Sequence, residues 1–432
     1  MSLTHVSSRD DCLALDRADP LHALRAQFDL PPGVIYLDGN SLGVLPRATP
    51  ARVAQVVQQE WGQGLIRSWN SAGWMDLPQR VGDKIGRLVG AAPGTLVAAD
   101  STSVNLFKVL AAALTIQRAD VPARRVIVSE RSNFPTDLYI AESLAREHGC
   151  ELVLLEPDEI ATRLQDDVAL LMLTHVNYRS GRMHDMAALT AVAHAAGALV
   201  VWDLAHSAGA VPVDLTGADA DFAVGCGYKY LNGGPGAPAF VWAHPRHVDR
   251  FWQPLSGWIG HAAPFEFTPG YRPAKGISRY LCGTPSVVQL AALECGVDTV
   301  LAAEPLGGMT ALREKSLALT RLFAQLVEQR CAGHGLAVSS PSDDKLRGSQ
   351  VCLTRSEGAY AIVQALIARG VIGDFREGDK AHPAGALDVL RFGFTPLYVG
   401  HADVWDAVEQ LRQVMHTGEW REARFNQRAA VT

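Results

Sequence analysis

The hydrophobic pattern between residues 95 and 245 alternates between short apolar runs and longer segments with helical spacing. The short runs are almost continuously apolar, which is typical of strands that are buried on both faces. They are TLVAA (95–99), RVIV (125–128), ELVLL (151–155), VALLML (168–173), ALVVW (198–202), DFAVG (221–225) and PAFVW (238–242). This alternation predicts an α/β fold in which a mostly parallel sheet carries helices on both faces.

The pattern changes beyond residue 300. Apolar residues recur at helical spacing over 309–330, which predicts one long helix packed against a domain. Shorter strand and helix candidates follow it, as is typical of a smaller α+β domain. The first fifty residues are rich in proline and turn signals, and we expect them to pack with this small domain. The predicted organisation is therefore an N-terminal segment (1–50), a large domain (51–300) and a small C-terminal domain (301–432).

Composition narrows the class of protein. The chain has 432 residues, 48% of them hydrophobic and 19% charged, which suits a soluble protein of at least two domains. Its 39 basic and 45 acidic residues give a net charge of −6 without a basic block, which argues against nucleic-acid or membrane partners. The N-terminus does not resemble a signal peptide. Seven scattered cysteines without a CxxC pair favour the reducing cytoplasm and make a metal site improbable.

Polar and ionisable side chains follow several of the predicted strands. In open parallel sheets, ligands bind beyond the carboxyl ends of the strands. Asp203 directly follows the run 198–202, and Lys229 comes four residues after the run 221–225. Hydroxyl side chains at 101–103 begin a predicted helix, where free N–H groups can hold a phosphate. The other strand-end candidates are Phe134, Asp137, Thr174 and His206.

Together these side chains suit a pyridine aldehyde phosphate. A lysine can form a Schiff base with the aldehyde, and a carboxylate keeps the ring nitrogen protonated. An aromatic side chain such as Phe134 can stack on the ring. Each residue also has an ordinary structural role when taken alone, for example as a helix cap or a core residue. Their joint placement at strand ends is what favours the cofactor.

One motif indicates a different class of enzyme. GNSLG (39–43) matches the G-x-S-x-G nucleophile elbow of serine hydrolases and follows a short strand candidate. Pro46 comes almost at once, however, and disfavours the long helix that such an elbow should open. A serine hydrolase stays open as an alternative.

Eight stretches of the chain, taken together, resemble bacterial kynureninase, a pyridoxal-phosphate family with the aspartate-aminotransferase-like fold. The resemblance runs from about residue 30 to residue 415. The stretches are YLDGNSLG (36–43), RSWNSAGW (67–74), NFPTD (133–137), WDLAHSAGAVPVDL (202–215), GYKYLNGGPG (227–236), PLSGWIGH (254–261), RYLCGTP (279–285) and LRFGFTPLY (390–398). The family pattern has no counterpart of the segment 377–388.

The resemblance implies a role for each matching residue. Lys229 is similar to the Schiff-base lysine and Asp203 to the partner of the pyridinium nitrogen. Tyr228 is similar to a contact of the cofactor phosphate, and it is also the candidate for a proton shuttle at the substrate carbonyl. Further cofactor contacts are implied for Thr102, Ser103, Phe134, Asp137, Thr174, His206, Trp258 and Thr284. Arg391 resembles the guanidinium that grips the substrate α-carboxylate, while Trp69 and Asn70 would line the pocket for the aryl ring.

The implied activity is the pyridoxal-phosphate-dependent hydrolysis of L-kynurenine to anthranilate and L-alanine in tryptophan degradation. The resemblance also implies a homodimer, in which SGW (256–258) and CGT (282–284) reach the site of the neighbouring subunit. The sequence does not separate kynurenine from 3-hydroxykynurenine, which would give 3-hydroxyanthranilate. Another lyase of the same fold, such as a cysteine desulfurase, and a non-enzymatic cofactor-binding protein stay open as alternatives.

Overall fold

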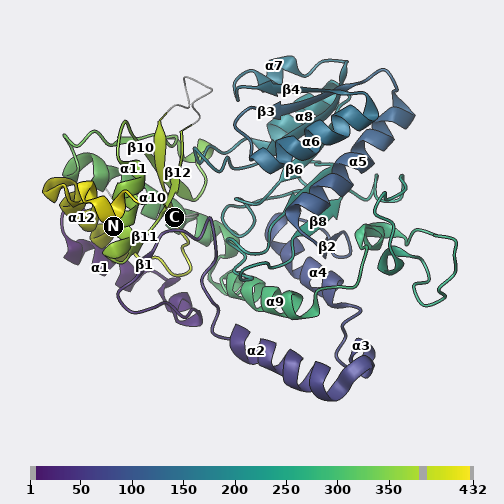
Figure 1. The fold of residues 1–432 in the computed structure, drawn as a ribbon, viewed down its shortest axis with the longest axis horizontal. Coiled ribbons are helices and arrows are strands. Elements are labelled where there is room, and N and C mark those ends of the chain that lie inside the picture. The colour runs from purple at the N-terminus through teal and green to yellow at the C-terminus, as the bar shows by residue number, and fades with distance from the viewer. Residues whose placement is uncertain (1–5, 379–386, 429–432) are drawn as a thin grey trace. The chain divides into compact units, whose positions relative to one another are not determined.

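The computed structural model describes residues 6–378 and 387–428, which fold into two compact units (Figure 1). The smaller unit comprises residues 1–47, 179–183 and 302–432, and the larger unit comprises residues 48–178 and 184–301. Most of the segment 377–388 lies outside the described residues.

The larger unit is built on a seven-stranded sheet with the order β2-β8-β7-β6-β5-β3-β4. Its strands are β2 (Leu96–Ala98), β3 (Val126–Glu130), β4 (Glu151–Leu155), β5 (Val168–Thr174), β6 (Leu199–Asp203), β7 (Phe222–Gly225) and β8 (Phe240–Ala243). Strands β4, β3, β5, β6 and β7 pair in parallel, and β8 is antiparallel to both of its neighbours. The predicted α/β fold with a mostly parallel sheet is confirmed.

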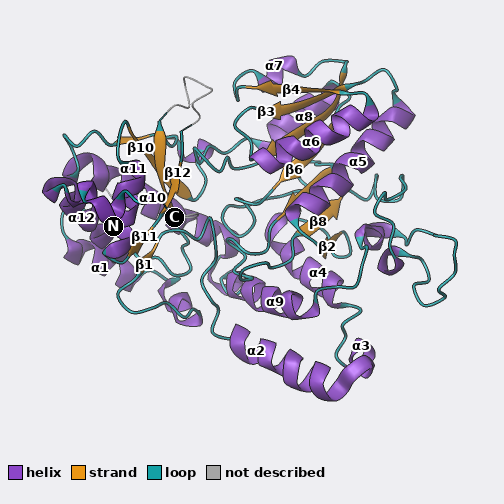
Figure 2. Cartoon of the chain, viewed as in Figure 1, coloured by secondary structure: helices purple, strands orange, loops and turns teal. Residues whose placement is uncertain are grey.

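Helices cover both faces of this sheet (Figure 2). Successive side chains of a strand point to opposite faces, so neighbouring residues of β6 report on the two sides. Val201 packs in a core cluster with residues of α5 (Thr102–Asp120) and α6 (Pro135–His148). Trp202 faces the other way, and its indole N–H donates to Thr190 of α8 (Met186–Ala195) at 3.2 Å.

Helices α5 and α6 have clear sequence signals at their ends. The side chain of Ser101 caps α5 by accepting from the N–H of Val104 at 3.2 Å. Helix α6 begins with Pro135 and ends at Gly149, whose φ of 65° needs a residue without a side chain. The other helices of the larger unit are α2 (Thr49–Gln55), α3 (Ser68–Ser71), α4 (Leu77–Val89), α7 (Ile160–Arg163) and α9 (Val287–Leu301).

In its described residues, the smaller unit combines a four-stranded antiparallel sheet with four α-helices. The strand order is β12-β13-β10-β9, and β1 (Ile35–Tyr36) pairs separately with β11 (Val371–Ile372). The strands are β9 (Ala337–Val338), β10 (Gln350–Arg355), β12 (Asp374–Arg376) and β13 (Asp388–Gly393), and the helices are α1 (Arg9–Ala18), α10 (Gly308–Arg330), α11 (Ala359–Ala368) and α12 (His401–Thr417). Among the helices of the described residues, none has the length and apolar character that crossing a membrane requires.

Candidate active site

The carboxyl ends of β5 and β6 bring three of the predicted site residues together. Thr174 and Asp203 are the last residues of these strands and lie opposite each other in the parallel pairing. The hydroxyl of Thr174 lies 3.4 Å from Asp137 Oδ2 and 3.5 Å from Asp203 Oδ2. It donates to Asn133 Oδ1 at 2.5 Å. All of these side chains are buried, so they form a polar cluster closed off from water.

Asp137 and Asp203 form a buried pair of acids whose charges act on each other. Burial, the largest cause, raises the pKa of both carboxyl groups, and the negative charge of Asp203 raises the pKa of Asp137 further. Asp203 is stabilised as the anion by the charge of Lys229 and by the N–H of Ala205, which donates to its Oδ1 at 2.8 Å. These contacts favour the proton on Asp137 and the negative charge on Asp203.

Lys229 lies in the segment that follows β7 and is only partly exposed. Its Nζ is 2.9 Å from His206 Nε2 and 5.6 Å from the ring centre of Tyr228. The lysine charge also acts on the two acids at the strand ends. The structure thus places an amine, an imidazole and an anionic carboxylate at one edge of the sheet, as the strand-end positions predict.

A hollow of about 300 Å³ lies at the start of α5. Thr102 and Tyr228 line it, and Ser103 follows Thr102 in the first turn of the helix. The first N–H groups of a helix lack partners within the helix and carry partial positive charge, so they suit a phosphate group. The remaining residues that line this hollow are Asp100, Ser101, Cys226, Gly236, Ala237, Pro238, Ala239 and Ser286.

The aromatic candidates are arranged in two places. Phe134 is 43% exposed and contacts Tyr178 edge-on, with ring centres 5.3 Å apart, so one face is available to a ligand. Trp69 on α3 packs against Trp258, with ring centres 6.0 Å apart. The other members of the implied set, Asn70 and Thr284, are exposed.

Arg391 lies on β13 in the smaller unit and is only 1% exposed. Its Nε donates to Asp374 Oδ1 at 2.8 Å, and its Nη2 donates to the hydroxyl of Ser41 at 2.8 Å. A second bond joins Nη2 to Asp374 Oδ2, so the pair is bidentate. The guanidinium is therefore held in a fixed orientation by its neighbours.

Sequence reasoning missed two buried residues, Glu130 and Asn133, whose side chains form hydrogen bonds at this edge of the sheet. Glu130 ends β3 and is buried, and its carboxylate accepts from Asn177 at 2.7 Å and lies 2.7 Å from His184 Nε2. Asn133 joins Thr174 to the N–H of Phe134, which donates to its side chain at 2.7 Å. Both residues stand in the polar stretch after an apolar strand, but only the folded chain shows what they contact.

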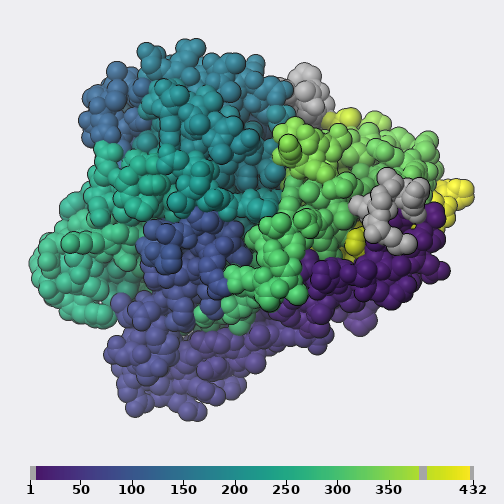
Figure 3. Space-filling model, turned by 180° about the vertical axis from the view of Figure 1, so that it is seen from behind, coloured from purple at the N-terminus to yellow at the C-terminus, as the bar shows by residue number. Residues whose placement is uncertain are grey.

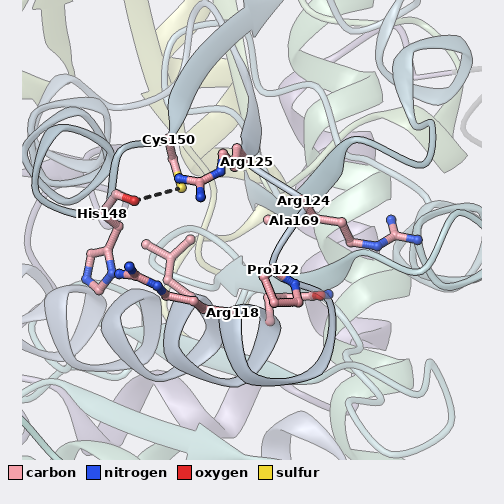
Figure 4. A pocket seen from close by; sticks show the side chains of 9 residues that line it. Arg118, Pro122, Arg124, Arg125, His148, Cys150 and Ala169 are labelled. Atoms are coloured by element: carbon pink, nitrogen blue, oxygen red, sulfur yellow. Dashed lines mark hydrogen bonds between the residues drawn. The ribbon is translucent and has the colours of Figure 1, made fainter.

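A separate small cavity of about 20 Å³ lies at the opposite edge of the sheet (Figure 4). Its residues precede or begin β3, β4 and β5, whereas the acid pair follows β5 and β6. Arg118, Arg125 and His148 stand around it, and the thiol of Cys150 donates to the carbonyl of His148 at 3.9 Å. None of the predicted site residues lines this cavity, and it belongs to a different part of the molecule.

Solved structures with similar folds identify the class of protein. The cysteine desulfurase of Thermococcus onnurineus NA1 superposes with a TM-score of 0.77 at 19% identity, covering 91% of this chain and 98% of its own. A variant of the lyase C-DES, solved with glycine covalently linked to its PLP cofactor, superposes with a TM-score of 0.75 at 17% identity over 90% and 98% of the two chains. The fold is therefore that of the fold type I pyridoxal-phosphate enzymes.

Sequence relatives then give the family. The kynureninase of Pseudomonas fluorescens is 55% identical over 430 residues, which is 99% of this chain and 100% of the relative. The kynureninase of Burkholderia pseudomallei (strain 1106a) is 56% identical over the same shares. The family model "Kynureninase C-terminal domain" matches residues 312–411. The chain belongs to the kynureninase family, whose members are hydrolases that act on carbon–carbon bonds.

Proposed function

We propose that this protein hydrolyses L-kynurenine to anthranilate and L-alanine in tryptophan degradation, with pyridoxal phosphate held by Lys229. The observation that carries the proposal is the Lys229 amine, which lies 2.9 Å from His206 at the edge where the anionic Asp203 also lies. Membership of the kynureninase family supports the same reaction. We place the enzyme in the cytoplasm, which suits cysteines that are free thiols.

The residues at this edge fit pyridoxal phosphate by their chemistry. Lys229 would hold the aldehyde carbon, Asp203 the ring nitrogen, and the first turn of α5 with Thr102 and Ser103 the phosphate. Phe134 offers an exposed aromatic face for the ring. When bound, pyridoxal phosphate supplies an aldehyde that condenses with amines and a protonated ring that withdraws electrons from the substrate.

The protein's own groups would then move the protons. The Lys229 amine would remove the proton from the substrate Cα, and His206, 2.9 Å from this amine, would help to hold the resulting charge. The Asp203 carboxylate keeps the ring nitrogen protonated. Tyr228 donates a proton near the substrate ketone. One water molecule adds to this ketone carbon, and cleavage of the Cβ–Cγ bond yields alanine and anthranilate.

Three residues are proposed to bind the substrate itself. Arg391 would bind the α-carboxylate, because its guanidinium carries a permanent positive charge. Its bonds to Asp374 and Ser41 keep the planar group oriented before the substrate arrives. Trp69 and Asn70 would line the pocket for the aryl ring.

An assay of product formation tests the proposed reaction. The protein loaded with pyridoxal phosphate is incubated separately with L-kynurenine, 3-hydroxykynurenine and L-cysteine. We expect equal amounts of anthranilate and alanine from L-kynurenine, measured by anthranilate fluorescence and amino-acid analysis. Sulfide from cysteine without anthranilate from kynurenine would instead identify a desulfurase, and bound cofactor without any product would identify a binding protein.

The acid pair makes a prediction of its own. Asp137→Asn replaces a carboxyl group that already carries a proton, so we expect kcat/KM to fall less than about 10-fold. Asp203→Asn removes the negative charge that faces the ring nitrogen, so we expect a loss of about 100-fold or more. The two variants have the same shape change at neighbouring positions and serve as controls for each other. Equal losses in both would contradict the assignment of the proton to Asp137.

We further propose that the active enzyme is a homodimer whose sites are shared between subunits. Two surface segments, residues 48–71 and 252–271, carry large apolar side chains that a partner could cover; both are visible in Figure 3 in violet-blue and green. Trp61 is 61% exposed, Ile66 77% and Phe267 76%. Exposed apolar groups in such number are typical of an interaction surface. Trp258 and Thr284 would reach the neighbouring subunit's cofactor from segments beside this surface.

Mixed dimers test whether the sites are shared. One subunit carries Lys229→Ala, and the other carries Trp258→Ala with Thr284→Ala. If Trp258 and Thr284 serve the neighbouring site, each mixed dimer contains one intact site, and we expect about half of the unsubstituted activity. The two parent dimers, purified with separate tags, give the baseline. Mixed dimers as inactive as their parents would show that each site is built from one chain.

A further inference from the structure

Lys108 on α5 is completely enclosed, with none of its surface exposed. Lysine is almost never buried in this way unless it is paired. Its ammonium group donates to the carbonyl of Tyr280 at 2.6 Å and to Asn105 Oδ1 at 3.4 Å. The third partner is the carboxylate of Asp100. Helix α5 thus carries a buried cation, and the reaction proposed above does not use this cation.

Asp100 connects this cation to the hollow at the start of α5. Its side chain is 31% exposed, and the residue lines the hollow together with Ser101 and Thr102. The backbone of Asp100 has a φ of 49°, a left-handed conformation that a residue with a side chain seldom adopts. Its carbonyl accepts from the N–H of Ala239 at 2.9 Å. The turn between β2 and α5 is therefore fixed with an acid at the rim of the hollow.

The described residues that line the hollow include a single acid, Asp100, and no lysine or arginine, which is unexpected for a site that binds an anion. A bare carboxylate beside a phosphate dianion would repel it strongly, because charges interact more strongly near protein than in open water. An ammonium group in direct contact with the carboxylate cancels most of that repulsion.

We infer that Lys108 is a positioning residue that neutralises Asp100, so that the hollow accepts the phosphate group of the cofactor. The inference rests on the proposed function, which places that phosphate at the start of α5. Lys108 does not contact the phosphate itself, and it acts through Asp100. Its bond to the Tyr280 carbonyl also holds the start of the segment that leads to Thr284.

Binding to the cofactor-free protein separates this role from simple packing. Dissociation constants are measured by absorbance for pyridoxal phosphate and for pyridoxal, which lacks the phosphate. For Lys108→Met, we expect binding of pyridoxal phosphate to weaken about 10-fold or more, while pyridoxal binding changes less than about 2-fold. Adding Asp100→Asn to this variant should restore pyridoxal phosphate binding to within about 3-fold of the unsubstituted protein.

Asp100→Asn alone provides a test that leaves the buried lysine in place. With the acid removed and the cation kept, pyridoxal phosphate should bind about 3-fold more tightly, and pyridoxal binding should not change. Weaker binding of pyridoxal phosphate in this variant overturns the inference, as does an equal loss for both ligands in Lys108→Met. If the unsubstituted protein binds neither ligand, the proposed function fails as well, so the two failures are distinguishable.

Discussion

Lys229→Ala should abolish the hydrolysis of L-kynurenine, with kcat falling ~10³-fold or more, because the variant loses both the cofactor attachment and the proton acceptor. The amine lies 2.9 Å from His206 and its charge acts on Asp203, and an alanine at 229 supplies neither function. We expect pyridoxal phosphate to bind only noncovalently, so that the visible absorbance of the bound cofactor resembles that of the free aldehyde. Anthranilate release and the visible spectrum are the two measurements.

Borohydride reduction provides the covalent test of the same assignment. On the unsubstituted protein, reduction followed by peptide mapping should place the cofactor on the peptide that contains Lys229. Lys345→Ala changes an exposed lysine of the smaller unit and serves as the matched control, with unchanged activity and labelling. A cofactor label on another lysine, or normal turnover by Lys229→Ala, would refute the role of this amine.

The central sheet could be predicted from the sequence because its strands are buried on both faces. Continuous apolar runs leave little ambiguity, and each of the seven runs from 95 to 242 overlaps one strand of the sheet. The reversal of β8 could not be predicted, since an apolar run has the same composition whichever way it points. The sequence also did not show that residues 179–183 belong to the smaller unit. Their contacts include bonds between backbone atoms, such as the N–H of Met183 to the carbonyl of Leu346, and such bonds leave no mark in the sequence.

The sequence predicted which strand ends carry the candidate site, but not how the side chains there interact. Parallel strands bring their carboxyl ends to one edge, so Thr174, Asp203 and Lys229 could be expected there. The raised pKa of Asp137 depends on its burial and on the nearby charge of Asp203, which no sequence pattern encodes. Lys108 was overlooked for the same reason, because a lysine in a helix usually faces solvent.

The structure also bears on the two enzymatic alternatives. Ser41 of the GNSLG motif donates to Asp374 at 3.0 Å and accepts from Arg391, and neither partner is a base of the kind that activates a serine nucleophile. Helix α2 begins only at Thr49, so no helix opens at the motif. Burial raises the pKa of Cys352 to about 11, which keeps this thiol protonated and unsuited to take up sulfur.

Replacing Arg391 should give the largest loss of stability outside the core. Asp374 is 1% exposed, and Arg391→Met removes its buried, bidentate partner, so that of its two guanidinium partners only the more exposed Arg376, at 2.7 Å, is kept. Breaking a buried ion pair by removing one partner typically costs ~3–5 kcal/mol of the free energy of unfolding. We expect a loss of this size by urea titration at pH 8, together with a raised KM for L-kynurenine in the folded protein. Arg391→Met with Asp374→Leu, which removes both charges, should recover part of the stability.

The pH dependence of this loss of stability follows from Asp38, a third ionisable group whose carboxyl interacts with the charges of Asp374 and Arg391. Burial and the charge of Asp374 raise the pKa of Asp38 to about 7, while Arg391 lowers it. An acid whose pKa is higher in the folded than in the unfolded state binds more protons when folded, so stability falls as the pH rises through that interval. Without Arg391, the pKa of Asp38 rises further, because the charge that lowers it is gone. The deficit of Arg391→Met should therefore be smaller at pH 5 than at pH 8, and a deficit independent of pH would show that Arg391 stabilises the unit by packing alone.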